Sequence, residues 1–158
     1  MWKTAAKTVG NPQKMWELIQ EHKMESTLGN HELNVLRRKH IKLPEKAYQW
    51  IRQCPLFIQG PTYKVVHAGY NPVGPTLFND AIYMRHWPNK RSKTFWWNYY
   101  RGEKLIIYGH DAMRLLQDNR PYSLGLDTGC VYGERLTGYL LEEDRLVHVW
   151  ANEQYCPI

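Results

Sequence analysis

Polar side chains with metal-binding or acid–base chemistry follow several short apolar runs, each marked by a glycine. They are Asn30 and His31 after Gly29, His67 before Gly69, His110 after Gly109, and Asp127 before Gly129. In α/β sheets, ligand sites lie outside the strand ends, where loops converge. Imidazole nitrogens and an amide oxygen from different loops form a suitable shell for a divalent metal ion. The pattern therefore predicts a metal site, although each histidine taken alone is more typical of a structural residue.

The tetrapeptide Gly29-Asn30-His31-Glu32 permits two interpretations. Glycine lets the backbone turn where other residues would be strained, Asn30 suits a helix N-cap, and Glu32 suits a first helical turn. The first interpretation is a capped helix after a tight turn. The second is a strand-to-helix loop that aims Asn30 and His31 into a site. The tetrapeptide alone does not choose between them.

Three helices are predicted in the first third of the chain. Asn11 is a suitable N-cap and Pro12 suits a first helical position, so we expect a helix from about Pro12 to Lys23. Two further helices are expected over about 31–39 and 44–53. A short strand over about 24–28 should connect the first helix to Gly29.

Strands are predicted in most of the remainder. Apolar, β-branched runs at 62–69, 104–110 and 122–129 each end in a glycine or a Gly-His pair, which indicates buried strands that end in loops. Segments 135–141 and 145–151 alternate like antiparallel strands around an acidic turn. An aromatic-rich stretch from Phe78 to Tyr100 should hold two helices. No domain boundary is evident, so we expect a single domain over residues 1–158.

Composition limits the class of protein and of ligand. The 158 residues are 43% hydrophobic and 23% charged, which is typical of a globular chain, and the formal charge of +6 suits an anionic ligand. Basic groups at 37–39 with Lys42 and at Lys90, Arg91 and Lys93 favour a solvated face over a nucleic-acid surface. Three cysteines without a signal-like segment predict reduced thiols in the cytoplasm. No apolar run is long enough to predict a membrane partner.

Four motifs together resemble successive motifs of the calcineurin-like metallophosphoesterases. They are GNHE at 29–32, VVHAG at 65–69, YGH at 108–110 and LDTGCVYGERLTGYLL at 126–141. The chain looks most similar to the branch that contains bacterial serine/threonine protein phosphatases and symmetrical diadenosine-tetraphosphate hydrolases. The resemblance covers about residues 11–150.

That resemblance implies a phosphohydrolase with two divalent ions, which are manganese, iron or zinc, and attack by a metal-bound hydroxide. Asn30, His67 and His110 would be ligands of one ion. His31 would stabilise the transition state or protonate the leaving oxygen, and Arg85 in YMRHW would grip the substrate phosphate. Asp127 would hold a ligating histidine in its tautomer. The alternatives are a surface helix residue for Arg85 and a turn residue for Asp127.

The family's two Asp-rich motifs, of types GDxHG and GDxxD[RK]G, have no counterpart upstream of GNHE, because the first aspartate is Asp80. Asp111 also stands where threonine or serine is usual, and Glu134 replaces a usual glycine. We therefore expect a mixed α/β (α+β) fold, a calcineurin-like four-layer α/β/β/α sandwich that is incomplete at its N-terminus. At most one metal site and weak or no activity are expected from residues 1–158 alone.

The predicted function is metal-dependent hydrolysis of a phosphomonoester or phosphoanhydride, in a phosphoprotein or a dinucleoside polyphosphate. One alternative is a catalytically inactive fragment or descendant that binds phosphate or nucleotide. Another is a nucleic-acid-binding module that uses the basic and aromatic residues. Metal content and a phosphatase assay separate the hydrolase from the inactive binding protein. A steep salt dependence of nucleic-acid binding would identify the nucleic-acid-binding module.

Overall fold

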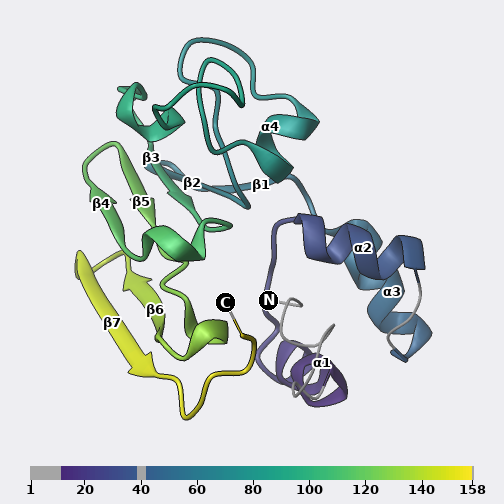
Figure 1. The fold of residues 1–158 in the computed structure, drawn as a ribbon. Helices are drawn as coiled ribbons and strands as arrows, with labels where there is room; N and C mark the ends of the chain where they lie inside the picture. Colours follow the sequence, from purple (N-terminus) through teal and green to yellow (C-terminus); the bar gives the residue numbers. More distant parts are fainter. Residues whose placement is uncertain (1–11, 39–41, 158) are drawn as a thin grey trace.

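The computed structural model describes residues 12–38 and 42–157, and it confirms the three predicted helices to within a few residues (Figure 1). These are α1 (Pro12–Glu21), α2 (Asn30–Arg38) and α3 (Glu45–Gln53). Lys39, the predicted end of the second helix, lies outside the described residues. Apolar residues at helical spacing give each helix one inward face. Those faces meet in one cluster of buried side chains: Trp16, Ile19, Val35, Ala47, Tyr48 and Ile51.

The strand predicted over 24–28 is wrong. This segment is neither helix nor strand, and a hydrogen bond from Leu28 N to Pro55 O (2.8 Å) joins its end to the residues after α3. A strand exists only as part of a ladder with a neighbour, and no described strand pairs with this segment. The bond to Pro55 still fixes the direction from which the chain enters α2.

The main sheet has five strands in the order β1-β2-β3-β5-β4. Its three central strands match predicted runs and are parallel: β2 (Tyr63–Val66), β3 (Leu105–Tyr108) and β5 (Ser123–Gly125). The antiparallel edge strands β1 (Phe57–Gln59) and β4 (Gln117–Asn119) were not predicted, since three residues are too few to show a pattern. Parallel pairing brings the carboxyl ends of β2, β3 and β5 to one edge of the sheet.

The aromatic-rich stretch covers the sheet with one α-helix, α4 (Phe78–Tyr83), and one short 3-10 helix, Trp96–Asn98, where two helices were predicted. Their buried side chains form a second cluster with β2 and β3. Its members are Val66, Ala81, Trp96, Trp97, Tyr100, Ile106 and Tyr108. The cluster fixes the two strands from which His67 and His110 emerge.

The predicted antiparallel pair is confirmed as the hairpin of β6 (Arg135–Leu140) and β7 (Arg145–Trp150). Arg120, just after β4, reaches two carboxylates at once, those of Asp118 (Nη2–Oδ2, 2.7 Å) and of Asp144 in the hairpin turn. The guanidinium therefore links the hairpin to the main sheet.

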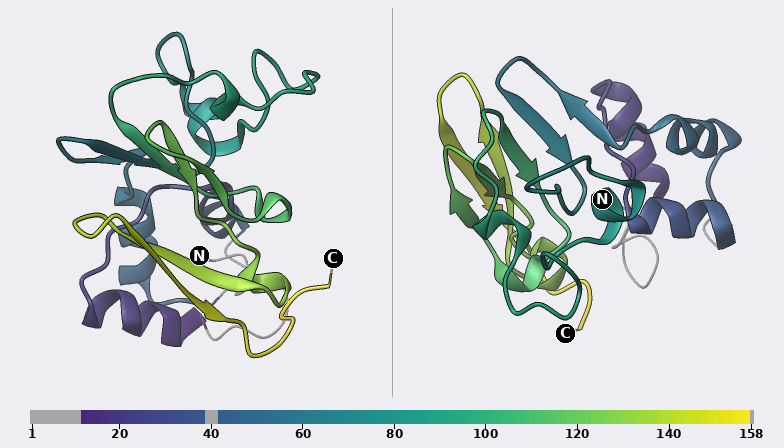
Figure 2. Two further views of the ribbon diagram at one scale, coloured as in Figure 1. Left: turned by 90° about the vertical axis from the view of Figure 1, so that its left-hand side faces the viewer. Right: turned by 90° about the horizontal axis from the view of Figure 1, so that it is seen from above.

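Figure 1 and the right-hand view of Figure 2 show α1–α3 on one side of the molecule and the strands on the other. The expected mixed α/β class is confirmed. In the described part of the chain no helix has the length and apolar character needed to span a membrane. Cys54, Cys130 and Cys156 are free thiols.

Candidate active site

Three of the predicted site residues meet at one point between the main sheet and α2. Nε2 of His67 lies 2.8 Å from Oδ1 of Asn30 and 3.1 Å from Nδ1 of His110. The two imidazole rings are inclined at 63° with their centroids 5.0 Å apart. The three side chains thus come together from positions as far apart in sequence as residues 30 and 110.

Parallel strands bring the two histidines together. His67 follows the last residue of β2, and Gly109-His110 follows the last residue of β3. A hydrogen bond from Gly109 N to His67 O (3.0 Å) continues the β2–β3 pairing past the strand ends. The backbones of the two histidines are therefore held in a fixed relation before their side chains meet.

His110 has an unusual backbone conformation, with φ of 75°. Positive φ is uncommon outside glycine and asparagine, and it persists where the surrounding structure imposes it. The Arg85 guanidinium donates a hydrogen bond from Nη2 to the carbonyl oxygen of His110 (3.3 Å), which helps to hold this turn. The turn directs the imidazole of His110 back towards His67.

Asn30 is the first residue of α2, and its side chain contacts His67, which agrees with the second interpretation of GNHE for this side chain. The strand that this interpretation placed before the turn is absent from the structure of residues 24–28. Gly29 has a different role from the turn that was expected, because its φ is not positive. A Cβ added to Gly29 would lie 2.5 Å from Nδ1 of His67 and 2.6 Å from Oε2 of Glu32. Glycine is required here because the His67 ring packs against the backbone.

Burial keeps His67 neutral. Desolvation lowers the pKa of His67 from 6.5 to about 4, and the nearby positive charge of His31 lowers it further. A neutral imidazole has a lone pair available for a cation. His31 is thus close enough to His67 to influence the protonation of its ring.

The donor set suits a single divalent cation. Two ring nitrogens and an amide oxygen converge on one point. A proton on Nε2 of His67 can form a hydrogen bond with either Asn30 Oδ1 or His110 Nδ1, but not with both at once. Ligands at about 2.0–2.2 Å from a common ion lie roughly 3 Å or more apart, close to the spacing seen here. In the described residues, however, no group of three His, Cys, Asp or Glu side chains could hold a metal. The side chains that contact His67 Nε2 are therefore one imidazole and one amide.

Arg85 and Asp127 both lie near this cluster. Arg85 comes after α4, with its side chain 46% exposed, and reaches the loop of His110. Asp127 follows β5, and its Cβ lies 3.6 Å from the position that a Cβ on Gly109 would take. Its carboxylate accepts a hydrogen bond from Gly129 N (3.5 Å), which is the contact of a turn residue.

From the sequence, Glu32 is expected only as a residue of the first turn of α2. The structure buries it to 3% exposure, beside Gly29 and the His67 ring. Charged residues are rarely buried without a partner or a functional reason. The apolar pattern of α2 could have indicated this, because Glu32, Val35 and Leu36 have the spacing of one helix face.

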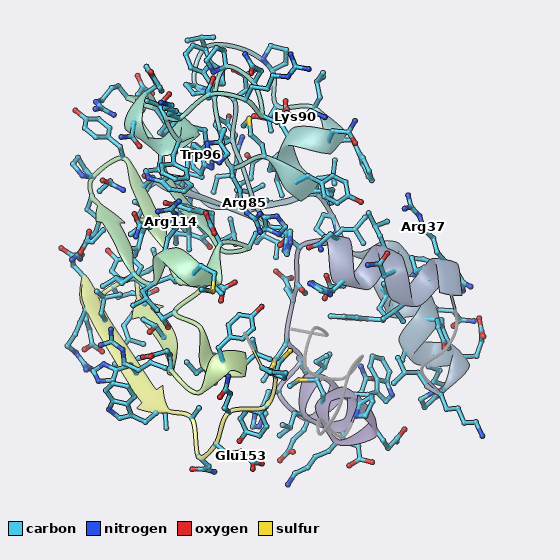
Figure 3. All side chains as sticks on the ribbon, in the orientation of Figure 1. Arg37, Arg85, Lys90, Trp96, Arg114 and Glu153 are labelled. Carbon is cyan, nitrogen blue, oxygen red and sulfur yellow. The ribbon has the colours of Figure 1, made fainter. Side chains whose placement is uncertain are left out.

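One described member of each basic group, Arg37 and Lys90, shows where the groups begin. In Figure 3 Arg37 extends from α2 on one side of the molecule, and Lys90 belongs to the loop after α4, in another region. Both side chains are exposed. This arrangement is that of solvated faces.

No family model matches the chain. It is 23% identical over 154 residues to an asymmetrical bis(5'-nucleosyl)-tetraphosphatase of Oceanobacillus iheyensis, covering 88% of this chain and 60% of that protein. It is 26% identical over 152 residues to the same type of enzyme from Bacillus mycoides, covering 86% and 59%. The chain thus spans about 60% of the length of these relatives.

A crystal structure of a protein provisionally named a diadenosine tetraphosphatase has the same fold. The TM-score is 0.78 at 26% identity, covering 85% of this chain and 72% of that one. Its similarity agrees with the expected fold class. The relatives are named asymmetrical, whereas the sequence motifs alone had suggested the symmetrical type.

Proposed function

We propose that this chain, a calcineurin-like metallophosphoesterase by its motifs, fold and relatives, is a metal-dependent hydrolase of phosphoanhydride bonds in dinucleoside polyphosphates. The observation that carries the proposal is the meeting of Asn30, His67 and His110 at one point. The names of the relatives favour a dinucleoside polyphosphate over a phosphoprotein. The charge of +6 favours such an anion as well.

Each site residue has a role in this proposal. Divalent ions would lower the pKa of water and neutralise phosphoryl oxygens when bound. Asn30, His67 and His110 would hold one such ion, which could be manganese, iron or zinc. His31 would donate a proton to the leaving oxygen, and Arg85 would bind a phosphate through its planar fork. Asp127 would orient one of the ligating histidines.

The direct test combines metal uptake with product analysis. The purified chain should bind Mn²⁺ in calorimetry, and His67→Ala should weaken that binding by at least about 10–100-fold, because even the loss of a group that only supports a ligand has an effect of that size. With Mn²⁺, diadenosine tetraphosphate should be hydrolysed, at a low rate, to ATP and AMP rather than to two ADP.

Three outcomes would contradict the proposal in different ways. Uptake of Mn²⁺ without hydrolysis would favour a phosphate- or nucleotide-binding protein that has no activity. Hydrolysis that persists in EDTA or in His67→Ala would exclude this metal site. No uptake at all would exclude a role for the cluster as a metal ligand set.

The role of His31 has its own test. His31→Ala should leave the Mn²⁺ affinity within about threefold of the original while it lowers kcat by about 10²-fold or more, as expected for loss of a general acid. Equal losses of metal and of turnover would make His31 a ligand.

A further inference from the structure

Two arginines converge on one carboxylate beside the proposed metal ligands. Nε of Arg85 lies 3.7 Å from Oδ1 of Asp111, and Nε of Arg114 lies 3.9 Å from Oδ2 of the same carboxylate. Asp111 is the residue after His110, and its side chain is only 13% exposed. Figure 3 shows the labelled Arg85 and Arg114 in the same region, near the end of β3. Two cations face one anion here, so the surface keeps a net positive charge.

The guanidinium of Arg114 has unused binding capacity. Its side chain is 53% exposed, and within the described part of the chain it makes no hydrogen bond, only the long ion pair with Asp111. Arg114 lies over the ring of Phe95 (4.7 Å to the centroid), which is itself stacked on Trp97 at 4.5 Å. The aromatic support limits the guanidinium's freedom while leaving the four N–H donors of its Nη1 and Nη2 groups for a ligand.

We propose that Arg114, which lies beside Arg85, forms a subsite for phosphate groups that are not cleaved, so that the site selects chains of three or more phosphates over a single phosphate. This inference rests on the proposed function, which places the reacting phosphate at Asn30, His67 and His110. A guanidinium binds phosphate oxygens bidentately. Arg114 is on the segment that follows His110, and Arg85 reaches that segment from the residues after α4, so the two guanidiniums can bind neighbouring phosphates of one polyphosphate.

Asp111 explains why the two arginines are found together. Threonine or serine is usual at this position in the family that the motifs resemble, and neither could attract two cations. The carboxylate holds both guanidiniums close to each other before a ligand arrives. Its ion pairs are long and partly exposed, so they are weak enough for a polyphosphate to replace.

The test measures binding without metal and without turnover. Calorimetry in EDTA at fixed ionic strength compares two probes, inorganic tripolyphosphate and orthophosphate. The original chain should bind tripolyphosphate at least about tenfold more tightly. Arg114→Gln should raise the Kd for tripolyphosphate by about tenfold, the effect of one charge-assisted hydrogen bond, and leave the Kd for orthophosphate unchanged. Arg114→Lys, which keeps the charge but not the fork, should show a smaller loss of about threefold.

Arg101→Gln is the matched control. Arg101 also lies over an aromatic ring, that of Tyr122 at 5.0 Å, but it precedes β3 and so belongs to the opposite end of the sheet. Equal Kd values for tripolyphosphate in Arg114→Gln and the original chain would overturn the proposal. An equal loss in Arg101→Gln, or no preference for tripolyphosphate in the original chain, would also overturn it. If Arg114→Gln does not fold, the Arg114→Lys comparison decides.

These results are separate from the test of the proposed function. Failure of metal uptake or of hydrolysis would leave the metal-free binding comparison interpretable. Loss of the tripolyphosphate preference would remove the subsite but leave the metal cluster and its hydrolysis assay intact.

Discussion

At the scale of single residues, the site depends on close approach more than on unusual chemistry. The His67 ring reaches Asn30 and His110 because the backbone at Gly29 leaves room for it. The ring's other edge faces Gly29 and the buried Glu32. A change of one methyl group at this point should therefore affect the whole cluster.

Gly29→Ala is expected to displace the His67 ring, because the new Cβ would lie 2.5 Å from its Nδ1. Overpacking of this kind costs about 1–3 kcal/mol of unfolding free energy. It should also weaken Mn²⁺ binding by about tenfold or more, since 1.4 kcal/mol corresponds to a factor of ten. Urea denaturation and calorimetry measure the two effects.

Gly74→Ala is the control for that change. The nearest atom to its added Cβ would be Nδ2 of Asn71 at 3.9 Å, an ordinary contact. Stability and metal affinity should both stay close to those of the original chain. Similar losses of stability and of Mn²⁺ affinity in the two variants would show that the close approach of the His67 ring to Gly29 does not determine either property.

Cys54 allows a prediction about pH. Burial raises the pKa of its thiol to about 11, and the negative charge of Glu32 adds to the shift. The thiolate is the form that reacts, and a raised pKa makes it scarce near neutrality. Alkylation of Cys54 by iodoacetamide should therefore be slow at pH 8 and rise about tenfold per pH unit up to at least roughly pH 9.5.

Peptide mass spectrometry can follow this reaction at Cys54. In urea, where the thiol returns to its ordinary pKa of about 8.5, the rate at pH 8 should be much higher. Equal rates in the folded and unfolded chain at pH 8 would show that burial does not protect this thiol.

At the scale of elements, the aromatic stretch before β3 supports the site. Trp96 is fully buried, with its ring 4.8 Å from that of Tyr108 at the end of β3. Phe95 and Trp97 stack beside it at 4.5 Å and also support Arg114. The short 3-10 helix thus holds both the strand end that carries His110 and one of the exposed arginines.

Trp96→Ala should cost about 3–5 kcal/mol of unfolding free energy, the usual loss when a large buried ring is deleted. Trp150→Ala is a matched change in an exposed ring, 61% accessible on β7, and should cost less than about 1 kcal/mol. Guanidinium denaturation followed by circular dichroism compares them. A small effect of Trp96→Ala would mean that this cluster is not part of the cooperative core.

At the scale of the whole molecule, several side chains link the β6–β7 hairpin to the rest of the described chain, among them Thr128, whose Oγ1 lies 2.6 Å from that of Thr137 in β6. Arg120 is another, because it binds Asp118 next to it and Asp144 in the β6–β7 turn. Tyr139 also donates a hydrogen bond to Asp144 (2.6 Å). The hairpin is therefore held to the main sheet by a charged network near the surface.

Arg120→Met should accelerate amide hydrogen exchange across β6 and β7. Arg145→Met is the control, because Arg145 pairs with Glu143 (2.7 Å) inside the same hairpin and links it to nothing else in the described contacts. Equal acceleration in both variants would show that the bridge to the main sheet is not what protects the hairpin.

The same bridge should depend on pH. The hydrogen bond that Arg120 donates to Asp118 lowers the pKa of this carboxyl below its ordinary value of 3.8. A lowered pKa in the folded state stabilises the protein above pH 3.8, and that contribution is lost as the pH falls through the lowered value. The difference in melting temperature between the original chain and Arg120→Met should therefore be present at pH 7 and shrink as the pH falls below 3.8. An unchanged difference would contradict a role for the ionised carboxylate.

The sequence by itself determined the chemistry of the site and most of the elements. The types of Asn30, His67 and His110, the three helices and the three buried strands follow from local patterns. Local periodicity records which side of a segment is buried, and three runs of similar form predict one shared edge. Those features could be predicted because they depend on neighbours in the chain.

Only the tertiary structure decided which groups touch and which segments pair. In the structure, segment 24–28 pairs with no described strand, and the short strands β1 and β4 complete the main sheet. The His67 ring packs against Gly29, and His110 has a positive φ. The tertiary structure also brought Arg114 to Asp111 beside Arg85. A ladder, a close approach or a shared carboxylate each needs a second segment distant in sequence, and side-chain periodicity holds no information about which segment that will be.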